Sequence, residues 1–182
     1  MKLAAAVALW GLTCICLAPG MALTAERVIV TLGGGIETSN RGATGPDDVT
    51  MFRALGVEFD KGFAVDEATL AGLPQRTIQA PLPGTDMPEM SFSGPALADV
   101  AALAGAAGKT LSPLALDGYQ IDIPPELIAT YDPILATHIG DVPLGLGDLG
   151  PAMVVFPRQD DPALEEELGG LEVWAVIYIE VR

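Results

Sequence analysis

The chain has 182 residues, of which 24 are acidic and nine are basic, giving a formal net charge of −15 at pH 7. A surface of that sign repels the phosphates of nucleic acids and anionic membranes, so we exclude both as partners. Half of the residues are apolar, which excludes a disordered chain and is enough for the core of one ordinary domain.

The first 25 residues have the pattern of a secretory signal peptide. Lys2 precedes an apolar run from Leu3 to Ala18, and Pro19-Gly20 break that run before a stretch of small residues. The run is shorter than the ~20 apolar residues that span a bilayer, which argues against a retained membrane segment. We expect residues 1–22 to be the signal, with cleavage as late as residue 25 as the alternative. The expected product is periplasmic or secreted, with no stable membrane anchor after cleavage.

Both cysteines, Cys14 and Cys16, lie inside this predicted signal. We expect the remainder, residues 26–182, to form a single domain. That domain has no thiol, so it forms no disulfide and offers neither a thiolate nucleophile nor a thiolate metal ligand.

The expected domain begins with a strand pattern. Arg27 to Leu32 is rich in β-branched residues, and the glycines at 33–35 are predicted to end the strand in a turn. These glycines lack the GxGxxG spacing, so a turn is favoured over a phosphate-binding loop. Residues 37–48 are rich in Gly, Ser, Asn and Asp and predict a loop.

A short helix and a second strand are predicted next. Asp66 is placed to cap a helix that runs to Gly72, with Pro74 stopping it. Thr77 to Ala80 predict a strand, and the prolines of residues 81–88 predict an irregular connection.

The clearest helix pattern follows Ser93-Gly94-Pro95. Pro95 is expected in the first turn, where its missing N–H costs nothing. Gly105 and Gly108 are expected to end the helix. Four apolar residues recur at i, i+3, i+4 and i+7 and form one stripe along the helix: Leu97, Val100, Ala101 and Ala104. We interpret this stripe as core packing rather than as a surface for a partner helix.

The C-terminal half is predicted to be mostly strand. Residues 111–116 and 119–123 are candidate strands, and 134–137 and 153–156 are short apolar runs of the buried-strand type. The strongest pattern covers 172–181, where the odd-numbered residues share one face. Helix patterns are few and no regular βαβ alternation is present, so we predict an α+β class with a mixed β-sheet.

Two segments have an ordered series of motifs. Phe92 to Pro124 has an F-x-G-x-x-L opening, a helix, a strand and an element D-G-Y-x-x-x-I-P. Ile134 to Pro157 has a Leu-Ala start, a Pro-Leu turn, a Gly-Pro, a short apolar strand and a closing proline. In this order the motifs resemble the oxidoreductase molybdopterin-binding domain of sulfite-oxidase-like proteins, in its short exported stand-alone form.

The resemblance implies the fold of that domain and suggests molybdopterin as a cofactor. The full enzymes of this family hold molybdenum through the pterin dithiolene and one cysteine thiolate. Ala80 stands near the position of that cysteine, and Met153 stands where those enzymes tend to carry an arginine. Both departures argue against sulfite-oxidase turnover.

Three residues are candidate cofactor-binding residues. His138 is the only histidine and has the chemistry of a base or ligand, the alternative being an ordinary loop histidine. Tyr119 is expected to form a polar pair with Asp117 near a pocket, or to follow a turn aspartate. Arg158 is the best contact for an anion, unless it pairs with the aspartates at 160–161.

No catalytic or metal-ligating residue is predicted. The acidic clusters lack the spacing of a twelve-residue calcium loop, and one histidine without neighbouring motifs does not define a triad. We expect an exported binding or accessory protein that lacks the cysteine ligand, with an unidentified small molecule or protein as its partner. Two alternatives stay open: an oxidoreductase that binds molybdopterin without a cysteine ligand, and a structural or interaction module with no cofactor.

Overall fold

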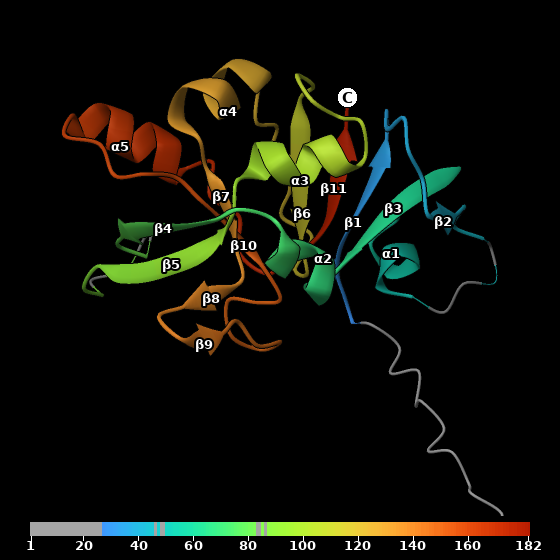
Figure 1. The fold of residues 1–182 in the computed structure, drawn as a ribbon, viewed down its shortest axis with the longest axis horizontal. Helices are drawn as coiled ribbons and strands as arrows, with labels where there is room; N and C mark the ends of the chain where they lie inside the picture. Colours follow the sequence, from blue (N-terminus) through green and yellow to red (C-terminus); the bar gives the residue numbers. More distant parts are fainter. Residues whose placement is uncertain (1–26, 46, 48–49, 83–84, 86) are drawn as a thin grey trace, which may run out of the picture.

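A computed structural model describes residues 27–45, 47, 50–82, 85 and 87–182 (Figure 1). The predicted signal at 1–22 and its two cysteines lie outside the described residues, so the signal and the domain boundary stay predictions. Within the described part, no helix is long and apolar enough to cross a membrane.

A five-stranded sheet forms one side of the molecule, in the order β2-β3-β1-β11-β6. β1 pairs with β11 in parallel, and the other neighbours are antiparallel. The first and last strands of the described chain therefore lie side by side at the centre of the sheet (Figure 1). The strands are β1 (Val28–Gly34), β2 (Arg41–Gly42), β3 (Lys61–Asp66), β6 (Leu111–Ala115) and β11 (Val176–Val181).

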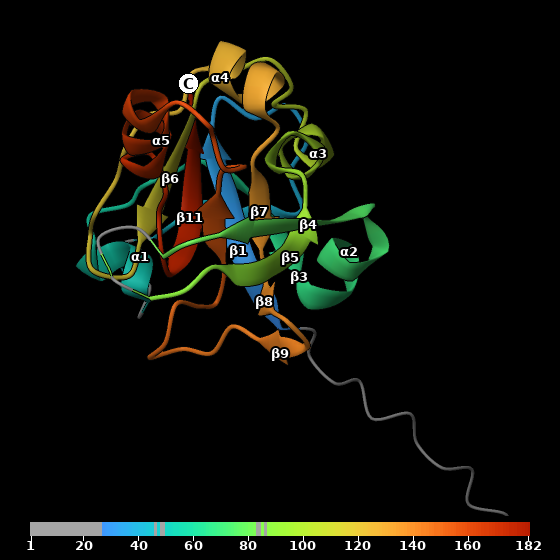
Figure 2. The ribbon, with the colours of Figure 1, turned by 90° about the vertical axis from the view of Figure 1, so that its left-hand side faces the viewer.

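The remaining strands form two smaller sheets. One has the order β4-β5-β8-β9 with antiparallel neighbours, and the other is the antiparallel pair β7 and β10. β5 crosses β7, as Figure 2 shows. The bounds are β4 (Gln75–Ala80), β5 (Met90–Pro95), β7 (Ile134–Ala136), β8 (His138–Ile139), β9 (Val142–Pro143) and β10 (Met153–Val155).

Five short helices connect and cover these sheets in the described residues. They are α1 (Met51–Ala54), α2 (Glu67–Gly72), α3 (Leu97–Leu103), α4 (Pro125–Tyr131) and α5 (Pro162–Gly169). Mixed sheets with short, irregularly placed helices make this an α+β fold, which confirms the predicted class.

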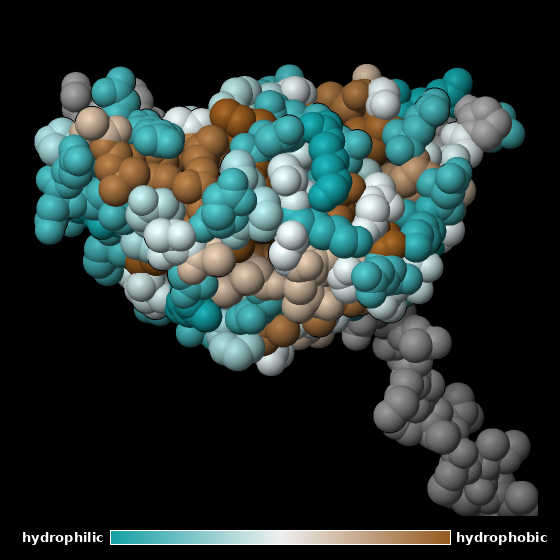
Figure 3. All heavy atoms as spheres, turned by 90° about the horizontal axis from the view of Figure 1, so that it is seen from above, coloured by the Kyte–Doolittle hydropathy of each residue, from teal (hydrophilic) through white to brown (hydrophobic). Residues whose placement is uncertain are grey.

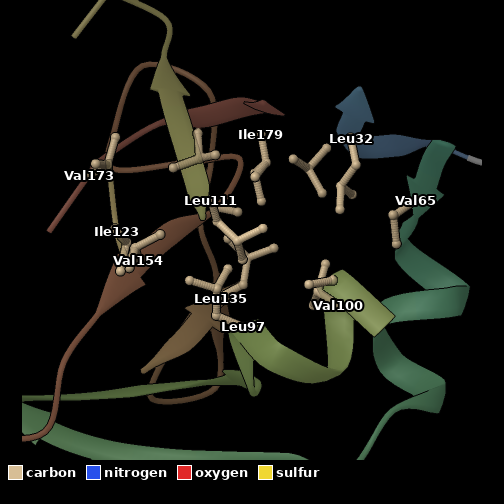
Figure 4. Close-up of a cluster of buried hydrophobic side chains, with 14 of the residues drawn as sticks. Leu32, Val65, Leu97, Val100, Leu111, Ile123, Leu135, Val154, Val173 and Ile179 are labelled. Carbon is tan, nitrogen blue, oxygen red and sulfur yellow. The ribbon is translucent and has the colours of Figure 1, made fainter. Parts of the chain in front are cut away.

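The main core lies between the five-stranded sheet, helix α3 and the β7–β10 pair (Figure 4). Side chains from distant parts of the chain meet there, among them Leu32 of β1, Leu97 of α3 and Ile179 of β11, each with no exposed surface. The predicted stripe of α3 points into this core, since none of its four residues exceeds 3% exposure. Its interpretation as core packing is confirmed.

A smaller aromatic cluster covers the opposite face of the five-stranded sheet. The cluster contains three aromatic rings, those of Phe52 in α1, Phe59 and Tyr178 in β11, and each pair of ring centroids is 5.8 Å apart.

On the face of the molecule seen in Figure 3, hydrophilic residues separate several groups of hydrophobic residues.

Several predicted boundaries differ from the structure. Pro95 is the last residue of β5 rather than part of the first helical turn, and α3 begins at Leu97. Residues 119–123 form two isolated bridges, at Gln120 and Ile123, instead of a strand. β11 begins at Val176 because Ala175 has a φ of 51°, a left-handed conformation that interrupts an extended strand.

Candidate functional site

A cavity with both polar and apolar walls contains His138 and has a volume of about 530 Å³. Its lining includes residues of α2, β5, β8 and the turn into β9, and Figure 2 labels these elements. Leu70, Leu144 and Pro151 form part of its apolar wall. The polar and charged side chains in the lining are Arg27, Glu67, Gln75, Ser93, Thr137, His138 and Asp141.

The strand register places His138 opposite Ser93. The two residues are antiparallel partners on β8 and β5, so their side chains lie on the same face of the sheet. The Thr137 hydroxyl lies 2.9 Å from His138 Nδ1, which holds the imidazole in orientation. Among the described residues, Nε2 has no hydrogen-bond partner and stays available to a ligand.

The other two candidate residues lie elsewhere. The Tyr119 hydroxyl donates a hydrogen bond to the Gly170 carbonyl at 3.2 Å, and its backbone N–H donates to Asp117 Oδ1 at 2.9 Å. Asp117 is thus a turn aspartate, whose side chain accepts a hydrogen bond from the backbone two residues later. This is the second of the two alternatives predicted for Tyr119 and Asp117. Tyr119 is 47% exposed and does not line the His138 cavity.

Arg158 pairs with Glu89 at 3.3 Å and with Glu165 at 3.8 Å, rather than with the aspartates at 160–161. Both carboxylates already partly neutralise the cation. Neither Arg158 nor Tyr119 lines the His138 cavity, so the structure does not bring the three candidates together. Their role in cofactor binding stays a prediction.

A second cavity, of about 400 Å³, lies beside Ala80 at the end of β4, under α5. Its walls include Leu82, Phe156 and Leu168, and its charged residues are Glu165, Glu166 and Glu172. This is the position near which the family resemblance implies a cysteine.

Glu172 is the most perturbed group in this cavity. Its Oε1 accepts a hydrogen bond from the Phe156 backbone N–H at 2.8 Å, whereas its buried Oε2 has no hydrogen-bond partner in the described structure. Burial raises the pKa of Glu172 to about 8, and the neighbouring Glu165 carboxylate adds to the rise. Near pH 7 the carboxyl is therefore mainly protonated.

Sequence reasoning did not single out Glu172. The available signal was an acidic residue between Leu171 and Val173, within the most hydrophobic strand pattern of the chain.

The residues around Ala80 do not fit a molybdopterin cofactor held by a thiolate. Ala80 contributes only a methyl group and is 3% exposed. Glu165 and Glu166 also line the cavity, and their carboxylates disfavour an anionic pterin phosphate. Met153, where an arginine is implied, is fully buried in an apolar cluster with Ala80 and Phe92. In the described residues, no three His, Cys, Asp or Glu side chains are grouped so as to hold a metal ion.

No model of a protein family matches this chain, and no curated protein matches it significantly. Among solved structures, the chain is similar to the sulfane dehydrogenase SoxCD from Paracoccus pantotrophus, with a TM-score of 0.55 and 17% sequence identity. The match covers 85% of this chain but only 38% of that chain. It shows a shared α+β fold.

Proposed function

We propose that this chain is an exported binding or accessory protein with the fold of a sulfite-oxidase-like molybdopterin-binding domain and without the cysteine ligand to molybdenum. The observation that carries the proposal is the cavity beside Ala80, which presents a methyl group and carboxyl groups near the position where the family resemblance implies a thiolate. That chemistry does not support molybdenum-dependent turnover.

The His138 cavity is the proposed ligand site. Its volume of about 530 Å³ is in the range of small-molecule sites. Ser93, Thr137 and Gln75 offer neutral hydrogen-bonding groups next to apolar wall from Leu70 and Leu144. The ligand proposed here is a small polar organic molecule that accepts or donates a hydrogen bond at His138 Nε2.

Native mass spectrometry of the protein purified from the periplasm tests this proposal. We expect a bound small molecule on the wild-type chain, and its loss from His138→Ala. Tyr131→Phe is a matched control, because Tyr131 packs against the main core and lines none of the described cavities. A pterin mass in stoichiometric amount would instead favour the oxidoreductase alternative.

The single histidine offers a second measurement. A chain labelled with ¹⁵N-histidine gives one pair of ring signals, and these report directly on the cavity. Addition of the molecule found by mass spectrometry should shift the Nε2 signal. An unchanged signal at saturating ligand would place the ligand elsewhere and contradict the proposed site.

A further inference from the structure

A third cavity, of about 380 Å³, lies over the face of the five-stranded sheet that carries the aromatic cluster. Its walls are mostly apolar, with Ile29, Phe52, Leu144 and Ile177 among them. The charged residues that line it are Arg27 and Arg41, both cationic. The chain has 24 acidic and nine basic residues, yet no acidic residue of the described part lines this cavity.

Arg41 is held in place from two sides. Its Nη1 donates a hydrogen bond to the hydroxyl of the buried Thr31 at 3.3 Å. The guanidinium carbon lies 4.9 Å from the ring centroid of Phe52 and 5.7 Å from that of Phe59, within the range of cation–π attraction. A guanidinium that is already oriented loses less entropy when it binds an anion.

Arg41 also lacks an ionic partner in the described structure, where no carboxylate lies within ion-pair distance of it. By contrast, Arg27, Arg76, Arg158 and Arg182 each pair with a carboxylate. Arg27 is occupied by Glu67 at 3.2 Å, so the positive charge available in this cavity belongs to Arg41.

The rim of the cavity exposes large apolar side chains. Val28 is 47% exposed, Met51 is 49% exposed and Leu146 is 74% exposed, and all three line the cavity. Exposed apolar groups gathered around a cavity mark a surface that gains free energy when a ligand covers it.

We propose that this cavity binds a singly charged anionic amphiphile, in which a carboxylate or sulfonate group pairs with Arg41 and an aliphatic chain lies along Val28, Met51 and Leu146. The fork of the guanidinium matches the two oxygens of such a head group. A neutral ligand leaves Arg41 without a counter-charge, and a multiply charged one meets the negative field of the whole protein. This site adjoins the His138 cavity, and Leu144 and Pro151 line both. Arg41 and Leu146 line only the site proposed for the amphiphile, so its failure would leave the proposed function untouched.

Isothermal titration of the purified full chain with decanoate, below its micelle concentration, tests the proposal. We expect decanoate to bind, and decanol and decyltrimethylammonium to bind at least tenfold more weakly, because neither forms the charge-assisted bond to Arg41. Decyl sulfonate is expected to bind as decanoate does. Absence of decanoate binding, or equal binding of decanol, would overturn the proposal.

Variants locate the site. Arg41→Gln should weaken decanoate binding about tenfold or more, whereas Arg182→Gln, an exposed arginine far along the chain, should leave it unchanged. Leu146→Ser should weaken binding several-fold, with Val142→Ser as its matched control, since Val142 is 67% exposed but does not line the cavity. If Arg41→Gln fails to fold, the comparison of Leu146→Ser with Val142→Ser still tests where decanoate binds. Equal losses of decanoate affinity in these two variants would contradict the proposed site.

Discussion

Glu172 and Phe156 are joined by a hydrogen bond of 2.8 Å from the Phe156 N–H to Glu172 Oε1, which ties the approach to β11 to the end of β10. The second carboxyl oxygen of Glu172 is buried without a partner in the described structure. A neutral carboxyl is suited to this place and an ionised one is not, because a buried charge without compensation is costly.

This relationship predicts a pH-dependent contribution to folding stability. The pKa of Glu172 is raised from 4.5 to about 8 in the folded protein. Between these values the unfolded chain releases a proton that the folded chain retains, so stability falls as the pH rises from about 4.5 to about 8. The loss is at most on the order of 4 kcal/mol.

Glu172→Gln should remove this part of the pH dependence, because glutamine stays neutral while keeping an acceptor for the Phe156 N–H. Urea unfolding at pH 4.5 and pH 8 should show similar stability at the lower pH and a more stable variant at the higher one. Glu58→Gln, at an exposed position, is the control and should follow the wild type. Parallel curves for wild type and Glu172→Gln would show that this carboxyl ionises normally.

Gly94 is predicted to be intolerant of a side chain. A Cβ at this position would collide with the Leu135 carbonyl oxygen and lie 2.8 Å from the Ala136 Cα, and these are backbone atoms of β7. Gly94→Ala should therefore cost about 2 kcal/mol or more, as overpacking does. Gly72→Ala is the control, since nothing lies within 4 Å of its Cβ. Chemical unfolding that gives equal stability for both variants would contradict the close crossing of β5 and β7.

Helix α5 is predicted to depend on its N-cap. Asp161 Oδ1 accepts a hydrogen bond from the Ala163 N–H at 3.0 Å, and Pro162 occupies the first turn. Asp161→Ala should destabilise the protein by about 1 kcal/mol, whereas the neighbouring Asp160→Ala should change it by less than about 0.5 kcal/mol. Urea midpoints of the two variants measure the difference. The same midpoint for both would mean that the cap contributes nothing.

Export predicts a shortened chain. The intact mass of protein recovered from the periplasm should correspond to a start at residue 23 or at residue 26, because cleavage is expected after Ala22 or after Ala25. Recovery of a chain that retains Lys2 would contradict the predicted signal.

The elements that could be predicted from the sequence are those with a local physical cause. Asp66 caps α2 through a 2.7 Å bond from the Thr69 N–H, and α2 ends at Gly72 as expected. The α3 stripe was readable because its period matches a helix, and Pro113 did not prevent β6 from forming. Helix α5 was not predicted, although Asp161-Pro162 is a capping signal. Its amphipathic pattern is weak, because Leu168 is the one buried residue of the helix.

The site was less predictable, because its residues come from separate elements. His138 meets Ser93 only through the antiparallel register of β8 and β5, and no spacing in the sequence encodes that pairing. Arg41 gains its orientation from Thr31 and from Phe52, which lie on β1 and α1. Such contacts depend on tertiary packing, which local patterns do not determine.

A binding or accessory role requires a domain that functions without a molybdenum cofactor, and the cofactor content of the purified protein distinguishes that role from the oxidoreductase alternative. The full-length gene is expressed in cells replete in molybdenum cofactor, and the periplasmic protein is assayed for molybdenum by metal analysis and for pterin by fluorescence. We predict far less than one molybdenum and one pterin per chain, because the cavity beside Ala80 offers carboxyl groups and no thiolate. One molybdenum and one pterin per chain would contradict the account.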